Sequence, residues 1–385
     1  MYFCTSEQYV NSNFNTLKTK SIILSLIGAA VFFFCGKAKA QVVFSPVFTQ
    51  VSLEARADFD FIHMDNNGTT DDDYGFHGKY FNFVVGGDLG EKFSYFFRQR
   101  IIASPGHVSL FDNTDFLYLT YRPNKKWMFR LGKDALAVGG FEYDAAPIDV
   151  LFSTNYWDNF YCFQLGAAAG YNSTDGNHLF LAQVANSPYV YYGASIGQSR
   201  GSEWRSGLLA YSLFWSGKFG HFRTLYSVNM FERSDNGYMN YIALGHKLLY
   251  DRWDIYLDLI HHALASDDWG KNYALVSCLN FHISGELNMF VKGAYEQNHS
   301  DVDLVSTIGL DCLTPAGNSI ITYGVGFEYN PSFCKDVRLH GFVANRNTKV
   351  ENNYTNTSLR NDSFTANIGI TWHMNIHRMF LERGL

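Results

Sequence analysis

The chain has 385 residues, of which 47% are hydrophobic, 17% aromatic and only 17% charged, and its formal net charge is −6. This acidic balance gives no support to nucleic-acid binding. Mean hydropathy is slightly negative, at −0.13, and after the N-terminal segment no apolar run approaches the roughly 20 residues that a membrane-spanning helix needs. Composition therefore leaves a soluble all-β protein or a membrane β-barrel.

The first forty residues have the pattern of an export signal. Lys18 and Lys20 precede the apolar stretch SIILSLIGAAVFFFCG, and small residues follow at Ala38 and Ala40. This order predicts a signal peptide over residues 1–40, with a retained anchor as the alternative. Cleavage would remove four Lys and one Glu and change the formal net charge from −6 to −9.

Apolar and polar residues then alternate with period two in an even number of segments, which is typical of half-buried strands. The sixteen predicted strands are 48–63, 79–88, 92–103, 113–122, 127–133, 161–171, 178–186, 204–216, 219–233, 237–250, 253–263, 271–284, 287–299, 319–330, 336–349 and 363–376. The last one contains FTANIGITWHMNI, which alternates without interruption. We expect it to close a barrel against the first strand, because closure removes an edge that lipid cannot satisfy.

The connections between these strands alternate between tight and long. Tight turns include LGE after the second strand and GK after the eighth, whereas the other set is mostly long, as in 64–78, 134–160 and 187–203. Short turns at one end and long loops at the other are typical of outer-membrane barrels with both termini in the periplasm. The sequence therefore predicts an all-β fold, a 16-stranded antiparallel transmembrane β-barrel over residues 41–376, with a C-terminal tail at 377–385.

The two faces of the predicted strands differ in charge. In the eleven strands with clear alternation, one parity carries no formal charge, which is expected of side chains that face lipid. The other parity carries charges of both signs. Sixteen strands enclose more space than side chains can fill, so these charges indicate a water-filled lumen.

The third long connection, residues 134–160, has five acids and no base. The acids are Asp134, Glu142, Asp144, Asp149 and Asp158. Its many aromatic residues need burial, and Gly139 and Gly140 offer a place to bend. We expect the loop to fold into the lumen as a constriction, although a loop that caps the mouth is the alternative. The expected pore wall opposite the acids consists of Arg56, Arg98, Arg100, Arg130 and Lys133. Opposed charges across a narrow gap would create a transverse field that orders polar solutes.

The segment RLGKDALAVGGFEYDAAPIDV, residues 130–150, resembles the phosphate-selective porin O and P family, particularly its members from Bacteroidetes. With the strand number and the closing strand, the resemblance covers roughly residues 45–376. It implies a sixteen-stranded barrel, usually a homotrimer, that passes small anions. The many acids beside the predicted bases favour general diffusion over phosphate specificity.

Other motifs are weaker. Acidic residues in 65–73 and the pair His261 and His262 suggest cation sites, but a solvated acidic turn and ordinary strand histidines explain them better. We expect no metal or cofactor.

A Ser–His hydrolase built on HVS (107–109) or HIS (282–284) lacks an evident third partner, and a plugged structural or adhesive barrel is a further alternative. The favoured function is an outer-membrane porin, embedded in lipid, for passive diffusion of small hydrophilic solutes or ions such as phosphate.

Overall fold

A computed structural model describes the chain over residues 47–66, 68–101, 111, 113–160, 162–189, 207–233, 237–263, 270–299, 304–305, 312–314, 316–350 and 362–376. Pro46–Leu385 forms one compact unit. The predicted signal peptide and the predicted C-terminal tail lie outside the described residues. Among the described residues, helices are too short and too polar to cross a membrane.

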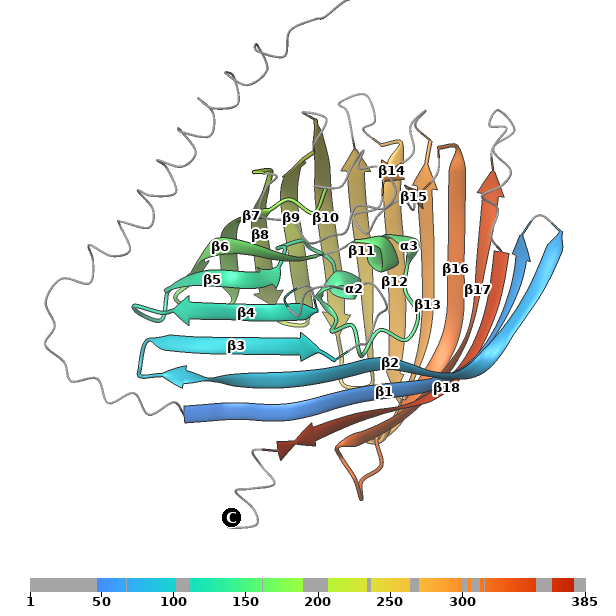
Figure 1. Cartoon of the computed structure of the whole chain (residues 1–385), viewed down its shortest axis with the longest axis horizontal. Coiled ribbons are helices and arrows are strands. Elements are labelled where there is room, and N and C mark those ends of the chain that lie inside the picture. Colours follow the sequence, from blue (N-terminus) through green and yellow to red (C-terminus); the bar gives the residue numbers. More distant parts are fainter. Residues whose placement is uncertain are drawn as a thin grey trace, which may run out of the picture. The chain divides into compact units, whose positions relative to one another are not determined.

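Sixteen antiparallel strands form a closed barrel, which confirms the predicted fold (Figure 1). The strands are β1 (Val47–Asn66), β2 (Thr69–Leu89), β3 (Phe93–Arg100), β4 (Thr114–Tyr121), β5 (Trp127–Ala135), β6 (Phe163–Asn172), β7 (His178–Asn186), β8 (Leu209–Phe219), β9 (Phe222–Glu232), β10 (Tyr238–Leu249), β11 (Trp253–Ala263), β12 (Asn272–His282), β13 (Leu287–Asn298), β16 (Asn318–Tyr329), β17 (Val337–Val350) and β18 (Asp362–Asn375). A separate two-stranded sheet, β14 (Leu304–Val305) with β15 (Cys312–Thr314), lies in the connection between β13 and β16. Each barrel strand pairs with its chain neighbour, and β1 pairs with β18.

The closing pair is continuous. β1 and β18 pair from Ser52 opposite Asn375 to Asp65 opposite Asp362. Every residue in this stretch therefore has a partner in the ladder, as a lipid-exposed sheet requires. The prediction that FTANIGITWHMNI closes the barrel is confirmed.

Two predicted boundaries are wrong. Residues 64–78 were expected to be a loop, but β2 begins at Thr69 and pairs with β1 up to Asn66. The acidic residues of this stretch have low strand propensity, and the cross-strand partners override it. The predicted turn at 217–218 is also displaced, because β8 continues to Phe219 and pairs with Phe222. Gly220 has φ +58°, which a glycine adopts at no steric cost, so the turn forms there.

The alternation predicted from the sequence is visible in the burial of the side chains. Leu131 and Leu213 are each 65% exposed on the outer surface, where lipid would cover them. Side chains of the opposite parity, such as Arg56, Asp58 and Asp258, are buried within the barrel. The barrel therefore has an apolar exterior and a charged interior.

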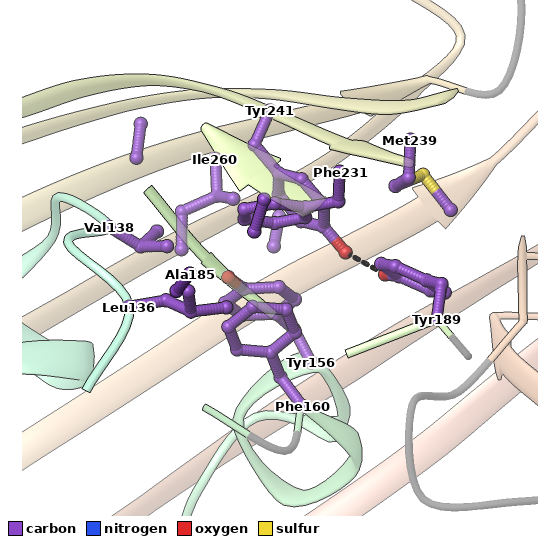
Figure 2. Packing of buried hydrophobic residues seen from close by; sticks show 13 residues of the cluster. Leu136, Val138, Tyr156, Phe160, Ala185, Tyr189, Phe231, Met239, Tyr241 and Ile260 are labelled. Carbon is purple, nitrogen blue, oxygen red and sulfur yellow. Dashed lines mark hydrogen bonds between the residues drawn. The ribbon is translucent and has the colours of Figure 1, made fainter. Parts of the chain in front are cut away.

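The segment between β5 and β6 lies among the strands, as the positions of α2 (Phe141–Asp144) and α3 (Asn155–Asn159) show (Figure 1). We call residues 136–160 the inserted segment. Tyr156 and Phe160 of this segment pack against Phe231 and Tyr241 of the wall (Figure 2). Tyr241 also forms a hydrogen bond with Tyr189. The burial that the aromatic residues needed is thus supplied inside the barrel.

Candidate pore constriction

The inserted segment contacts β9 through its two glycines. Gly139 N donates to Ser227 Oγ at 2.8 Å, and Gly140 N donates to the carbonyl of Leu225 at 3.2 Å. A Cβ on Gly139 would lie 2.5 Å from that same carbonyl oxygen. Gly140 has φ +105°, in the region that favours glycine. Only a backbone without side chains approaches β9 this closely.

Glu142 is the centre of the next anchor. Its backbone N donates to Asp258 Oδ2 at 2.8 Å, and Lys292 Nζ donates to its Oε1 at 2.6 Å. Thr154 donates to the same carboxylate from its backbone N at 3.0 Å and from its hydroxyl at 2.8 Å. Glu142 is only 2% exposed. The buried carboxylate of Glu142 thus joins Thr154 of the inserted segment to Lys292 of β13. The backbone N of Glu142 joins the segment to β11.

The short helix α3 is held at its first turn. Glu296 of β13 accepts hydrogen bonds from the backbone N of Asn155 at 2.9 Å and of Tyr156 at 2.8 Å. Thr154 caps the helix by accepting from Trp157 N at 3.1 Å. A carboxylate at a helix start satisfies amides that have no partner within the helix.

The remaining anchors lie on the other side of the barrel. Asp149 accepts from Arg338 Nη2 of β17 at 2.7 Å, and Asp158 accepts from Arg346 Nη2 at 3.3 Å. Arg56 of β1 donates to the carbonyl of Val150 at 2.7 Å. The inserted segment therefore has partners on β1, β9, β11, β13 and β17, and it crosses the lumen.

Phe152 adds an apolar contact to this crossing. Its ring lies 6.0 Å from that of Phe290 and 5.2 Å from that of Phe342, measured between centroids. Lys292 Nζ also donates to the Phe152 carbonyl at 2.5 Å. Together these contacts position the segment between β13 and β17.

Most of the loop acids form their ion pairs with bases other than the predicted wall residues. Glu142 binds Lys292 of β13, and Asp149 and Asp158 bind Arg338 and Arg346 of β17. Asp134 is the exception, since its Oδ2 lies 2.5 Å from Arg130 Nη1. That pair lies within one strand and does not cross the gap.

Arg98 and Arg100 share one acid that the sequence argument missed. Both guanidinium groups contact Asp115 Oδ2 of β4, at 3.0 and 2.8 Å. The β3–β4 register shifts between Arg98 and Gln99, so Asp115 is an extra residue at a bulge. A bulge interrupts strict alternation, so the position of Asp115 relative to the lumen does not follow from the sequence pattern of this strand.

Lys133 is also placed differently from the other predicted wall bases. It is only 1% exposed, and its Nζ donates to the carbonyl of Phe111 at 2.9 Å. The preceding Gly132 has φ +135°, and a Cβ there would lie 2.1 Å from the Leu117 carbonyl oxygen. The local backbone thus departs from regular strand geometry, and the ammonium is buried against the residue that precedes β4.

Asp144 in α2 is the least strongly bound of the loop acids. Burial raises the pKa of its carboxyl, and the nearby Lys247 ammonium partly offsets this effect. Lys247 itself forms an ion pair with Asp254 at 2.9 Å. Asp144 is therefore a solvent-accessible acid without a hydrogen-bonded base of its own among the described residues.

Arg56 joins the inserted segment to the barrel-closing strands. Its guanidinium pairs with Asp58 at 2.7 Å, and Asp58 also contacts His340 Nε2 at 3.0 Å. Asp58 reaches His340 across β18 at Gly369, where a Cβ would lie 2.3 Å from Asp58 Oδ1. Arg56, Asp58 and His340 are each at most 4% exposed, so Arg56 acts as a structural clamp rather than an exposed pore charge.

The weaker motifs form no evident reactive site. His282 contacts Asp254 at 3.0 Å, while Ser284 Oγ accepts from Leu287 N in the following turn. Residues 107–109 lie outside the described residues. Within the described part of the chain, groups of three or more His, Cys, Asp and Glu that could hold a metal ion are absent.

Comparison with known proteins supports a porin. Residues 50–268 match the family described as phosphate-selective porin O and P. Curated proteins gave no match. Similar solved structures include the outer membrane channel DcaP of Acinetobacter baumannii, with 12% identity, coverage of 84% of this chain and 96% of that chain, and a TM-score of 0.55. The anion-selective porin from Comamonas acidovorans is 11% identical, and the match covers 84% of this chain and 99% of that porin with a TM-score of 0.54. The trimer form of OmpT from Vibrio cholerae is 10% identical, and the match covers 84% of this chain and 99% of OmpT with a TM-score of 0.50. At these identities the likeness shows a shared fold.

Proposed function

Because the chain belongs to the phosphate-selective porin O and P family, we propose that it is a passive channel for small hydrophilic solutes or ions, including anions such as phosphate. It is an outer-membrane porin, and solutes would move through it down their concentration gradients. The inserted segment is the proposed constriction. A catalytic cycle is not needed for this function.

One observation carries the proposal. The inserted segment crosses the lumen on buried anchors but leaves charged groups partly exposed around it. Asp149 and Asp158 have side-chain exposures of 42% and 40%, and Arg346, Arg100 and Arg130 have 30%, 26% and 23%. Charges of both signs at a narrowing favour hydrated solutes and set an ion preference. Glu142, which is buried, is proposed to hold the constriction rather than to contact solute.

A second candidate function is a plugged barrel with a structural or adhesive role. Leu136, Val138, Tyr156 and Phe160 of the inserted segment pack with wall residues of β7 to β12, so apolar side chains fill part of the lumen (Figure 2). A plug would share this packing. Ion conductance separates the two functions.

The test is single-channel recording from the refolded mature chain, residues 41–385, in a planar bilayer. Stepwise openings, with a reversal potential under a salt gradient and partial block by added phosphate, are the expected result. A folded barrel without conductance would contradict the channel and favour the plug.

We propose further that the mature chain lacks residues 1–40 and assembles as a homotrimer with its short turns in the periplasm. The trimer form known for Vibrio cholerae OmpT supports this assembly for a barrel of the same fold. Light scattering of the detergent-solubilised protein measures the assembly directly, and a monomeric mass would contradict it.

A further inference from the structure

The lumen side of β2 to β6 carries a cluster of aromatic rings beside the predicted wall arginines. Phe116 and Tyr118 lie on the parity opposite the outward-facing Leu117 and Leu119, which are 45% and 41% exposed. The Phe96 ring lies 5.6 Å from that of Phe116 and 5.7 Å from that of Tyr118. We call Tyr80, Phe96, Phe116, Tyr118 and Phe163 with Arg98, Arg100 and Arg130 the aromatic–arginine wall.

Each arginine of this wall lies over a ring. The guanidinium carbon of Arg98 is 4.5 Å from the Phe116 centroid, and that of Arg130 is 4.2 Å from the Tyr118 centroid. Arg100 lies 5.7 Å from the centroid of Tyr80. Stacking holds the plane of a guanidinium group parallel to the ring. The N–H groups at the edge of the guanidinium then remain available to donate hydrogen bonds.

The wall carries more positive than negative charge. Its three guanidinium groups share Asp115 and Asp134 as acidic partners, which leaves one positive charge in excess. Arg130 Nε is buried and has no hydrogen-bond partner among the described residues. A donor of this kind costs free energy unless a ligand or water satisfies it.

The rings of this wall differ from the rings on the facing wall. Phe290 and Phe342 are covered by Phe152 of the inserted segment, and both are only 8% exposed. Tyr80, Phe96, Phe116 and Tyr118 remain partly exposed. Aromatic surface in a water-filled lumen gives no advantage to a small inorganic ion, but it stabilises a solute that has an apolar face.

We propose that the aromatic–arginine wall binds organic anions in which a carboxylate is attached to an aromatic ring, the chemical class of benzoate. The carboxylate accepts hydrogen bonds from the edges of Arg100 and Arg130, and the aromatic ring of the solute packs against the lumen-facing edges of Tyr118 and Phe96. Phosphate has no apolar surface and gains nothing from the rings. This inference rests on the proposed channel function and specifies its solute.

The experiment measures how benzoate, acetate and phosphate block chloride current through the refolded mature chain in a planar bilayer. Benzoate is expected to half-block at a concentration at least about fivefold below that of acetate, since a ring contact adds to the shared carboxylate contact. Tyr118→Leu should raise the half-blocking concentration of benzoate about three- to fivefold and that of acetate by a smaller factor, because Tyr118 contacts the ring of benzoate and also orients Arg130. Arg130→Gln should weaken block by both carboxylates.

Tyr323→Leu is the matched control, because Tyr323 lies on the outer face of β16 and is 49% exposed. Benzoate block should be the same in this variant as in the wild type. Equal block by benzoate and acetate, stronger block by phosphate than by benzoate, or an unchanged Tyr118→Leu variant would each overturn the inference while chloride conductance still supports a channel.

Equilibrium dialysis of benzoate against the folded protein in detergent makes the test independent of conductance. Wild-type protein should bind benzoate more tightly than the Tyr118→Leu variant. If the barrel conducts no chloride but binds benzoate in this way, the proposed channel fails and the binding site stands; if it binds none, the site fails as well.

Discussion

The two sides of the lumen neutralise their charges by different means. On β11 and β13, buried Asp258, Lys292 and Glu296 hold the inserted segment through its backbone amides and Glu142. On β3 to β5, Arg98, Arg100 and Arg130 pair with acids of the wall itself. The first side fixes the position of the inserted segment, whereas the second side carries partly exposed charged and aromatic side chains.

This difference shows that the acids of a loop need not face the nearest bases. The inserted segment leaves β5 and immediately crosses toward β9 through Gly139 and Gly140. Its acids therefore meet bases far along the chain, Lys292, Arg338 and Arg346. A field across the constriction would consequently act between the segment and β17 rather than between the segment and β3.

The largest expected effect comes from removing the buried base of the anchored side. Lys292→Met leaves Glu142 buried without its cation, which should lower the free energy of unfolding by about 3–5 kcal/mol. Urea unfolding of the barrel in lipid vesicles measures the loss. Loosening of the segment should also increase current noise in single-channel recordings.

Two comparisons make the Lys292 experiment specific. Lys349→Met changes an exposed lysine of β17 and should leave stability unaltered. The double variant Lys292→Met with Glu142→Gln removes both charges and should recover most of the loss, because no uncompensated charge is then left buried. No recovery would mean that Lys292 acts by packing rather than by charge.

A smaller effect is expected where the segment first touches the wall. Gly139→Ala places a Cβ 2.5 Å from the Leu225 carbonyl oxygen, and relief of this overlap should cost about 1–3 kcal/mol. Gly285→Ala is the control, because its Cβ would meet nothing within 4 Å. Equal stability of the two variants would contradict the close approach of the segment to β9.

Ion selectivity tests the other side of the lumen. Asp115→Asn removes the acid shared by Arg98 and Arg100, so the anion-to-cation permeability ratio should rise about two- to fivefold. Replacing both arginines by Ala should lower the ratio by a similar factor. Reversal potentials under a salt gradient measure both shifts, and Asp175→Asn in an exposed turn serves as the control. If the Asp115→Asn variant and the double arginine variant both shifted the permeability ratio in the same direction, the charges on this side of the lumen would not set the ion preference.

The smallest effect concerns pH. Burial raises the pKa of Asp144, so its protonated form is favoured in the folded protein. Its contribution to stability is present below the unfolded pKa, near 3.9, and is lost as pH rises through the folded pKa. Asp144→Asn should therefore be slightly more stable than the wild type at pH 7 and equal to it at pH 3. Urea midpoints at the two pH values test this, with Asp88→Asn in β2 as the control.

Much of the barrel could be predicted because each strand carries its own signal. Alternation identified sixteen strands, and an uncharged outer parity identified the lipid face. The predicted strand boundaries were wrong where pairing with a neighbouring strand overrode the low strand propensity of the segment. An example is the start of β2 at Thr69, where an acidic stretch pairs with β1. The need to bury aromatic side chains also pointed to the inward path of residues 136–160.

The partners within the constriction were not predictable in the same way. Asp115 lies at a bulge, and Lys133 follows a glycine with φ +135°, so alternation alone misplaces both side chains. Arg56 was expected to face solute, but it is buried against Asp58 and the Val150 carbonyl. These contacts depend on register and on the distance between strands that are far apart in sequence.

The amino-acid sequence by itself determined the strand number, the sidedness of each strand and the acidic, aromatic character of the third loop. These properties are local, because a strand repeats every two residues and lipid excludes charge from one face. Only the tertiary structure decided which base each acid meets. Closure of β1 on β18 brings residues such as Asp58 and His340 together, and the glycines at 139 and 140 carry the inserted segment across the lumen to Lys292. These two pairings are properties of the closed barrel, since the partners in each lie on different segments of the chain.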